Sequence, residues 1–163
     1  MPIEGVRFEH VEADVLVLGG GVSGFRAAAA ASACGVSVVH AYRARGASQY
    51  IFGFNVPLAH TDSRDTRETY LQDILRGGYH LNERGLVEAL VEGAQPALEE
   101  LVSIGVPFAR KGDKFDQLGL AGNTYPRSVY HPHGLGPLAI GKLDDRCGAL
   151  GVRKCAGWKP SRC

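Results

Sequence analysis

The sequence lacks the cysteine patterns of a disulfide scaffold or a metal site. It contains four cysteines, Cys34, Cys147, Cys155 and Cys163, and no two of them form a C-x-x-C pair. Zinc ligands and the disulfides of small secreted domains follow other spacings. We therefore expect free thiols in a reducing compartment, and a cytoplasmic location.

Long apolar runs, a leader and a strong charge are also missing. No apolar run reaches about 18 residues, the length that suggests a transmembrane helix. The first residues, MPIEGVRFEHVEA, do not place a basic region before an apolar stretch, so we expect no secretory signal. The net charge of +1 gives no indication of a basic surface that would bind nucleic acid. A hydrophobic fraction of 45% over 163 residues suits one soluble α/β domain.

Glycine, by contrast, is abundant at 22 residues, and its placement near the N-terminus is informative. The apolar run 15–18 predicts a buried strand, and the alanine-rich segment 25–34 predicts a helix that Gly35 ends. Residues 36–39 predict a second buried strand. This strand, turn, helix and strand fit within roughly thirty residues, the context that a dinucleotide-binding turn requires.

Gly19, Gly21 and Gly24 form a G-x-G-x-x-G motif between the predicted strand and helix. Gly19 permits a tight turn, Gly21 lets a pyrophosphate approach the backbone, and Gly24 lets the helix pack closely on the strand. The helix N-terminus adds free N–H groups and a partial positive charge. The motif predicts nucleotide binding.

One part of the dinucleotide fingerprint is absent. An acidic residue is expected about 20 residues after the motif, where it binds a ribose hydroxyl. Residues 15–61 contain neither Asp nor Glu, and Tyr42 lies 42 − 24 = 18 residues beyond Gly24. The ribose contact must come from Tyr42, from backbone or from elsewhere. Arg43 and Arg45 could instead suit the phosphate of an NADP site, or be solvated loop charges.

Residues 43–60 combine small residues with aromatics and show no clean periodicity. A long loop inside a compact domain is usually functional or disordered. Tyr50, Phe52 and Phe54 could line a flat apolar pocket, or they could belong to the core.

Two helices are predicted in the middle of the chain. The first is capped by Asp62 or Ser63 and runs to Arg76. The second is capped by Asn82, carries Leu86, Val87, Leu90, Val91 and Ala94 on its apolar face, and kinks or restarts at Pro96.

Short strands with turns at 111–113 and 122–123 are predicted next, before a helix that begins at Pro137. His131 and His133 would share a face of a strand and could chelate metal, but no third ligand is evident nearby. We therefore predict no metal site. From residue 152 the sequence turns basic and irregular, which predicts a truncated or unstructured tail.

Four segments resemble the N-terminal FAD-binding region of the fumarate reductase/succinate dehydrogenase flavoprotein family, which includes L-aspartate oxidase. They are ADVLVLGGGVSGFRAAAAA, RGASQYIFGFN, DSRDTRETYLQDILRGGYHLNERGLVEALVEGAQPALEELVSIGVPF and NTYPRSVYHPHGLGPLAIGKL. The resemblance implies an α/β, Rossmann-like fold of the glutathione-reductase type, incomplete in this chain. Residues 1–13 would be a lead-in, 14–151 the N-terminal portion of the FAD-binding domain, and 152–163 the irregular tail.

The resemblance also implies roles for individual residues. Ala47 aligns with the histidine that carries covalent FAD in some family members, so we expect non-covalent FAD. The positions implied to hold this cofactor are Gly19, Gly21, Val22, Ser23, Gly24, Tyr42, Arg43, Ala47, Ser48 and Gly53.

Family members are several times longer than this chain and carry their catalytic residues in a capping domain beyond its end, so no catalytic residue is assigned. The implied reaction is hydride exchange between flavin and a dicarboxylate-like substrate, with an electron-transfer partner or self-association. Two alternatives stay open: an NAD(P)-binding dehydrogenase domain, and a non-catalytic fragment that acts by association.

Overall fold

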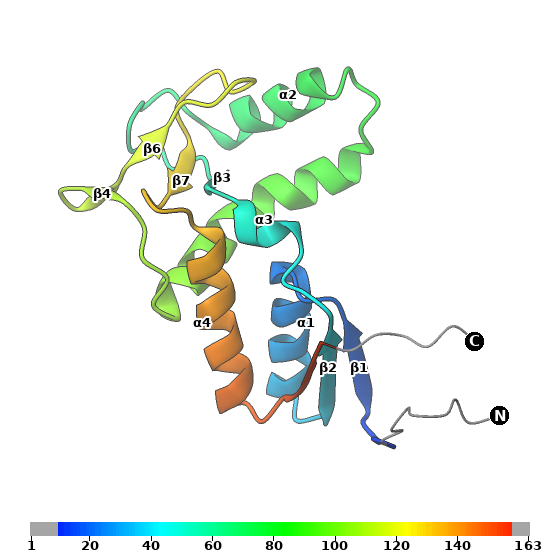
Figure 1. Cartoon of the computed structure of the whole chain (residues 1–163). Coiled ribbons are helices and arrows are strands. Elements are labelled where there is room, and N and C mark those ends of the chain that lie inside the picture. The colour runs from blue at the N-terminus through cyan, green and yellow to red at the C-terminus, as the bar shows by residue number, and fades with distance from the viewer. Residues whose placement is uncertain (1–9, 158–163) are drawn as a thin grey trace.

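The computed structural model describes residues 10–157, which form two packed parts (Figure 1). The first part is a parallel sheet of strand order β1-β2-β8. Helices α1 and α4 lie side by side against this sheet (Figure 1). The elements of this part are β1 (Val15–Leu18), α1 (Val22–Ala33), β2 (Val38–Tyr42), α4 (Gly136–Ala149) and β8 (Arg153–Ala156).

The second part surrounds a small antiparallel sheet of order β3-β7-β6. A hairpin of β4 and β5 projects beside it, and helices α2 and α3 pack together as its helical layer (Figure 1). Its elements are β3 (Gly53–Asn55), α2 (Arg67–Gly77), α3 (Arg84–Ser103), β4 (Arg110–Lys111), β5 (Lys114–Phe115), β6 (Gln117–Leu118) and β7 (Ser128–Tyr130). The 3-10 helix η1 (Ala47–Tyr50) leads from β2 into this part.

Each part has its own apolar core. The core beneath the parallel sheet includes Phe25, Ile140 and Leu143, all fully buried. The core of the second part includes Val56, Leu98 and Val129. Phe54 and Phe108 pack against both cores and so join the two parts.

The early strand, helix and strand of the sequence prediction are confirmed, with β2 beginning two residues later than the predicted start of its apolar run. The turns around Gly112 and Gly122 are also confirmed, and both glycines have positive φ. Helix α4 begins at Gly136 with a proline in its first turn, as predicted.

The predicted helix caps are wrong. The carboxylate of Asp62 accepts from the backbone and guanidinium N–H groups of Arg64, so it stabilises a turn before the helix. The cap of α2 is Thr66, whose side chain accepts from the Thr69 N–H at 3.1 Å. Helix α3 is capped by Glu83 rather than by Asn82.

Helix α3 is continuous through Pro96, where a kink or restart was predicted. Residues on both sides of the proline are anchored in the same core, including Val91 and Leu98. This burial outweighs the lost backbone hydrogen bond. Leu86 and Leu90, predicted on the buried face, are instead 70% and 54% exposed.

The predicted irregular tail is wrong for Arg153–Ala156, which form strand β8. The strand pairs in parallel with β2, with Val39 opposite Arg153 and Tyr42 opposite Ala156. Its polar sequence fits an edge position in the sheet, since Val152 supplies the buried apolar residue just before it. Residues 158–163 and most of the predicted lead-in lie outside the described residues.

Candidate cofactor-binding site

The glycine turn connects the C-terminal end of β1 to α1. Gly19 has φ +117°, a conformation that L side chains rarely adopt, and its N–H donates to the Ala41 carbonyl at 3.0 Å. A Cβ at Gly24 would overlap the Gly19 carbonyl, so α1 packs too closely on the turn for any side chain there. The turn and close packing predicted for these two glycines are therefore present.

The N-terminus of α1 is open to an anion. Its N-cap residue, Gly21, has no side chain to cap the helix, and its first turn carries no acidic residue. The Val22 N–H donates to Ser48 Oγ at 3.3 Å. Other first-turn N–H groups have no intrahelical acceptor, and the helix dipole adds positive potential there. This end of the helix can therefore bind a negatively charged group.

The loop at η1 packs directly against this turn. A Cβ at Gly21 would lie 3.1 Å from Ser48 Oγ, and one at Gly46 would lie 3.8 Å from Gly21 Cα. Gly136, at the start of α4, packs on the backbone of Ser48 without room for a side chain. The structure thus brings Ser48, predicted from a distant segment, against the glycine turn. Ala47 beside it is exposed.

Tyr42, at the end of β2, turns its ring toward the glycine turn instead of presenting an acid. The ring lies 5.3 Å from that of Phe25, centroid to centroid. A Cβ at Gly20 would lie 2.9 Å from Tyr42 Cδ2. The ring therefore covers the middle of the turn.

The two arginines after β2 differ in their surroundings. Arg43 is exposed. Arg45 lies 3.4 Å from the carboxylate of Asp144 on α4, which also accepts from Lys154 at 2.6 Å. Asp144 therefore neutralises Arg45 in part, which leaves Arg43 as the better candidate for contact with a cofactor.

The predicted aromatic cluster is divided between surface and core. Tyr50 is 81% exposed, while Phe52 is partly exposed and stacks on Tyr130 at 5.3 Å. Phe54 belongs to the core that joins the two parts. A Cβ at Gly53 would overlap the Val129 carbonyl, so strand pairing accounts for this glycine without any ligand.

The two histidines considered for metal binding lie close together, with ring centroids 5.6 Å apart. The His133 N–H donates to His131 Nδ1 at 3.3 Å. Among residues 10–157, no group of three or more His, Cys, Asp or Glu side chains is arranged to hold a metal ion.

His40 and a cluster of Arg127 with Asp65 and Asp73 are buried charged or titratable groups that were not identified from the sequence. His40, within the apolar run of β2, is fully buried and its Nε2 lies 2.7 Å from the Gly19 carbonyl oxygen. Arg127, which immediately precedes β7, is fully buried between Asp65 at 2.8 Å and Asp73 at 2.9 Å. The polar residue inside an apolar strand was the available signal for His40.

The two carboxylates that pair with Arg127 differ in the direction of their pKa shifts. Burial raises the pKa of Asp65, against the opposing attraction of Arg127. Burial would also raise the pKa of Asp73, but hydrogen bonds from Thr124 and the charge of Arg127 together lower it. The cluster joins β7 to α2 and the loop before it, which places it in the scaffold of the second part.

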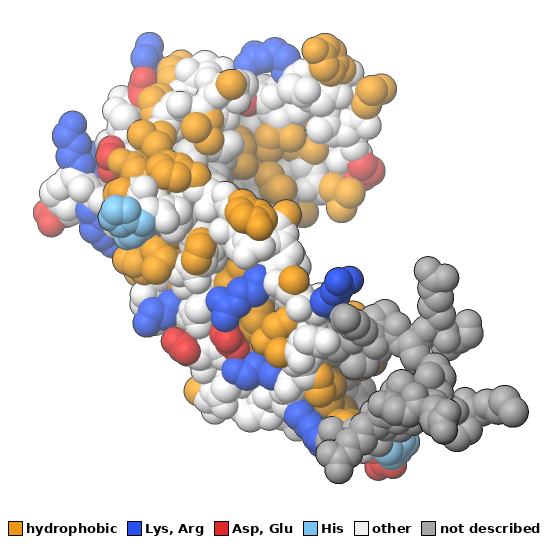
Figure 2. Space-filling view, viewed as in Figure 1, with side chains coloured by type: hydrophobic (Ala, Val, Ile, Leu, Met, Phe, Trp, Pro, Cys, Tyr) orange, Lys and Arg blue, Asp and Glu red, His pale blue; other side chains and the backbone are white. Residues whose placement is uncertain are grey.

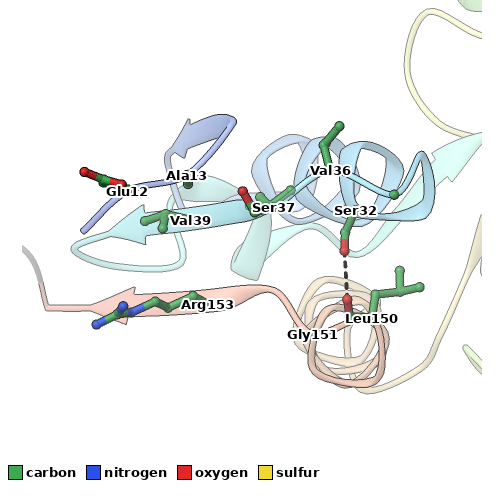
Figure 3. Close-up of a pocket in the computed structure, with 11 residues that line it drawn as sticks. Glu12, Ala13, Ser32, Val36, Ser37, Val39, Leu150, Gly151 and Arg153 are labelled. Carbon is green, nitrogen blue, oxygen red and sulfur yellow. Dashed lines mark hydrogen bonds between the residues drawn. The ribbon is translucent and has the colours of Figure 1, made fainter.

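A surface depression of about 510 Å³ lies at the other end of the parallel sheet (Figure 3). It is lined by residues that precede β2 and β8, including Ser37 and Gly151, and is bordered by the Ser32 Oγ hydrogen bond to the Leu150 carbonyl at 2.8 Å. Ligands of open parallel α/β sheets bind at the carboxyl ends of the strands. The glycine turn, and not this depression, is at that end.

Residues 14–152 match the family model for the FAD binding domain. The chain belongs to this family, whose cofactor is FAD. The predicted family, cofactor and FAD-binding α/β fold are therefore confirmed.

A curated relative from Methanothermobacter marburgensis, a subunit of its fumarate reductase (CoM/CoB), is 31% identical over 129 residues. These cover 76% of this chain and 24% of the relative. The chain thus spans about a quarter of that protein's length.

Solved structures show the same likeness. Sdh1 of Mycobacterium smegmatis, solved in complex with UQ1, superposes with a TM-score of 0.81 at 25% identity, over 89% of this chain and 27% of that one. E. coli quinol fumarate reductase FrdA has a TM-score of 0.77 at 21% identity, over 87% and 25% of the two chains, which supports the fold. Within residues 10–157, no helix has the length and apolar character to cross a membrane.

Proposed function

We propose that this chain is the FAD-binding portion of a flavin-dependent oxidoreductase that exchanges a hydride with a dicarboxylate-like substrate. The observation that carries the proposal is the uncapped N-terminus of α1 behind the glycine turn. Bound flavin would supply the redox chemistry, and the residues of this chain would bind and orient it. The substrate class is supported by the name of the curated relative, a fumarate reductase.

The proposed contacts divide along the length of the cofactor. Gly19, Gly21, Val22, Ser23 and Gly24 form the turn and helix N-terminus that would face the diphosphate. Of their N–H groups, that of Gly19 donates to the Ala41 carbonyl and that of Val22 donates to Ser48 Oγ. Tyr42 and Arg43 lie at the adenosine end, where the ring of Tyr42 replaces an acidic contact. Ala47, Ser48 and Gly53 lie along the path toward the flavin.

Ser48 Oγ takes the position of an anion oxygen at the helix N-terminus, since it accepts from the Val22 N–H. A bound diphosphate would share this N–H or replace the hydroxyl there. A serine hydroxyl and the Ala47 methyl group do not form the flavin bond of covalent family members, so FAD is held non-covalently. We assign no catalytic residue within this chain.

The proposed setting is a cytoplasmic enzyme with an electron-transfer partner. The curated relative is itself named as one subunit of its enzyme, which supports a partner chain. Cys34, Cys147 and Cys155 are free, as suits a reducing compartment.

The proposal is tested by titrating the protein with FAD and following flavin fluorescence. Gly21→Ala should weaken binding about tenfold or more, because the added methyl group enters the diphosphate site. Gly141→Ala, which adds the same group in the middle of α4 with nothing within 4 Å, should bind like the wild type. Acid precipitation of the complex should release the flavin into solution.

Three results would contradict the proposal. If the wild-type protein retains no FAD, the cofactor site fails. If NADPH displaces FAD or binds in its place, the NAD(P) alternative based on Arg43 gains support. Flavin that remains with the acid-precipitated protein would contradict non-covalent binding.

A second candidate, association with another copy or another chain, rests on strand β1. Within the described residues, β1 pairs with β2 on one side and its other edge carries no strand. Leu16 and Leu18 on it are 60% and 61% exposed. Figure 2 shows where apolar side chains reach the surface on one face of the molecule. Exposed apolar strands at a sheet edge promote association. Size-exclusion chromatography with light scattering, with and without FAD, tests this, and a monomer in both conditions would contradict it.

A further inference from the structure

His40 lies directly beneath the glycine turn. The residue is fully buried in β2, and its Nε2 approaches the Gly19 carbonyl oxygen at 2.7 Å. A carbonyl oxygen can only accept a hydrogen bond, so Nε2 carries the proton. The other ring nitrogen, Nδ1, is buried and has no hydrogen-bond partner among residues 10–157. A proton on Nδ1 would be a buried donor without an acceptor, which favours the neutral ring protonated on Nε2.

Packing holds this ring in one orientation. The edge-to-face contact with Phe25 has a centroid distance of 4.7 Å and an interplanar angle of 88°. The Tyr42 ring lies on another side at 4.8 Å. A Cβ at Gly24 would be 3.2 Å from His40 Nε2, so the ring also fills the space that this glycine leaves open.

The hydrogen bond has a consequence on the opposite side of the turn. Both backbone groups of Gly19 are now tied to β2, the N–H to Ala41 and the carbonyl to His40. In a trans peptide the C=O and the following N–H point in opposite directions. When the imidazole holds the Gly19 carbonyl, the Gly20 N–H therefore points away from His40.

We infer that His40 is a positioning residue for the cofactor: its neutral imidazole fixes the Gly19–Gly20 peptide so that the Gly20 N–H and the α1 N-terminus face the diphosphate. This inference rests on the proposed function. The imidazole does not touch the cofactor, and it acts through the backbone of the turn.

Two substitutions separate the hydrogen bond from the bulk of the ring. His40→Leu keeps an apolar side chain of similar size and removes the donor, and it should weaken FAD binding about tenfold, the effect of one lost hydrogen bond. His40→Gln retains an N–H donor. It should bind FAD within about threefold of the wild type, so the conservative variant should rescue what His40→Leu loses.

The outcomes are distinct. If His40→Leu binds FAD like the wild type, or if both variants weaken binding equally, the positioning role is overturned. Wild-type protein that binds no FAD rejects the proposed function instead. Circular dichroism of each variant without FAD checks its fold. If His40→Leu does not fold, nitrogen-15 NMR of the wild-type imidazole decides: protonated Nε2 with bare Nδ1 supports the inference, and a proton on Nδ1 at pH 7.5 overturns it.

Discussion

Replacing Arg127 with leucine should sharply destabilise the protein, because this arginine neutralises two carboxylates in the second core. The side chains of Arg127 and Asp65 are 0% exposed and that of Asp73 is 3% exposed. The guanidinium also lies over the Tyr70 ring, 4.9 Å from its centroid. Without the guanidinium, the two carboxylates keep their burial and lose their shared cation.

Removing one partner of a buried ion pair costs about 3–5 kcal/mol. A domain of this size is stable by about 5–15 kcal/mol in total, so Arg127→Leu should lose a large part of its stability. Burial raises the pKa of Asp65 in the wild type, and loss of the guanidinium that opposes this shift raises it further. Asp73 keeps its hydrogen bonds from Thr124 and its pairing with Arg76. A carboxylate whose folded pKa is raised destabilises the folded state only once it ionises, so the deficit is smallest near pH 4 and grows as the pH rises.

Urea unfolding followed by far-ultraviolet circular dichroism measures this deficit at pH 4.5 and pH 7.5. The matched control is Arg76→Leu, which removes a second arginine that pairs with Asp73 but is 65% exposed. It should cost less than about 1 kcal/mol, because solvent screens the exposed charge. The reasoning is refuted if Arg127→Leu loses less than its control at pH 7.5, or if its deficit does not shrink at pH 4.5.

Three further outcomes are expected. Gly24→Ala should lower the unfolding midpoint and abolish FAD binding together, because its methyl group overlaps the backbone of the turn; unchanged thermal unfolding would contradict this. Cys34 is exposed and should react with a thiol reagent in the folded protein. Burial raises the pKa of Cys147, so this thiol should react only after unfolding, and mass mapping of the labelled protein would show the difference. Burial and two nearby cations lower the pKa of His60. Its contribution to stability is therefore present above about pH 6.5 and lost as the pH falls further, and His60→Asn should remove this dependence from urea unfolding.

Local sequence patterns predicted most of the parallel part of the fold. The strand at Val15–Leu18, the glycine turn and helix α1 follow from apolar content, glycine spacing and alanine content within one short segment. The start of α4 follows from Pro137, whose missing N–H and fixed φ suit the first turn of a helix. In each case the determining residues are neighbours in the sequence.

The failures have both local and long-range causes. Asp62 and Thr66 are both good capping residues, and the local bond of Asp62 to Arg64, two residues further on, decides between them. Strand β8 contains two basic residues, and its formation depends on the open edge of β2 and on the pairing of Lys154 with Asp144. The close approach of Ser48 to the glycine turn likewise depends on how η1 packs between α1 and α4.

The glycines near the site fall into two groups that differ in what a side chain at each position would contact. Gly24, Gly53 and Gly136 each face backbone atoms that a side chain would overlap, so the fold itself requires them. Their presence therefore says little about a ligand. Gly21 faces a serine hydroxyl, at 3.1 Å from the position of a Cβ, and a hydroxyl on a loop can shift by the few tenths of an ångström that a methyl group needs. A loss of FAD affinity in Gly21→Ala without a loss of stability would therefore report the cofactor directly, whereas the same loss in Gly24→Ala would not.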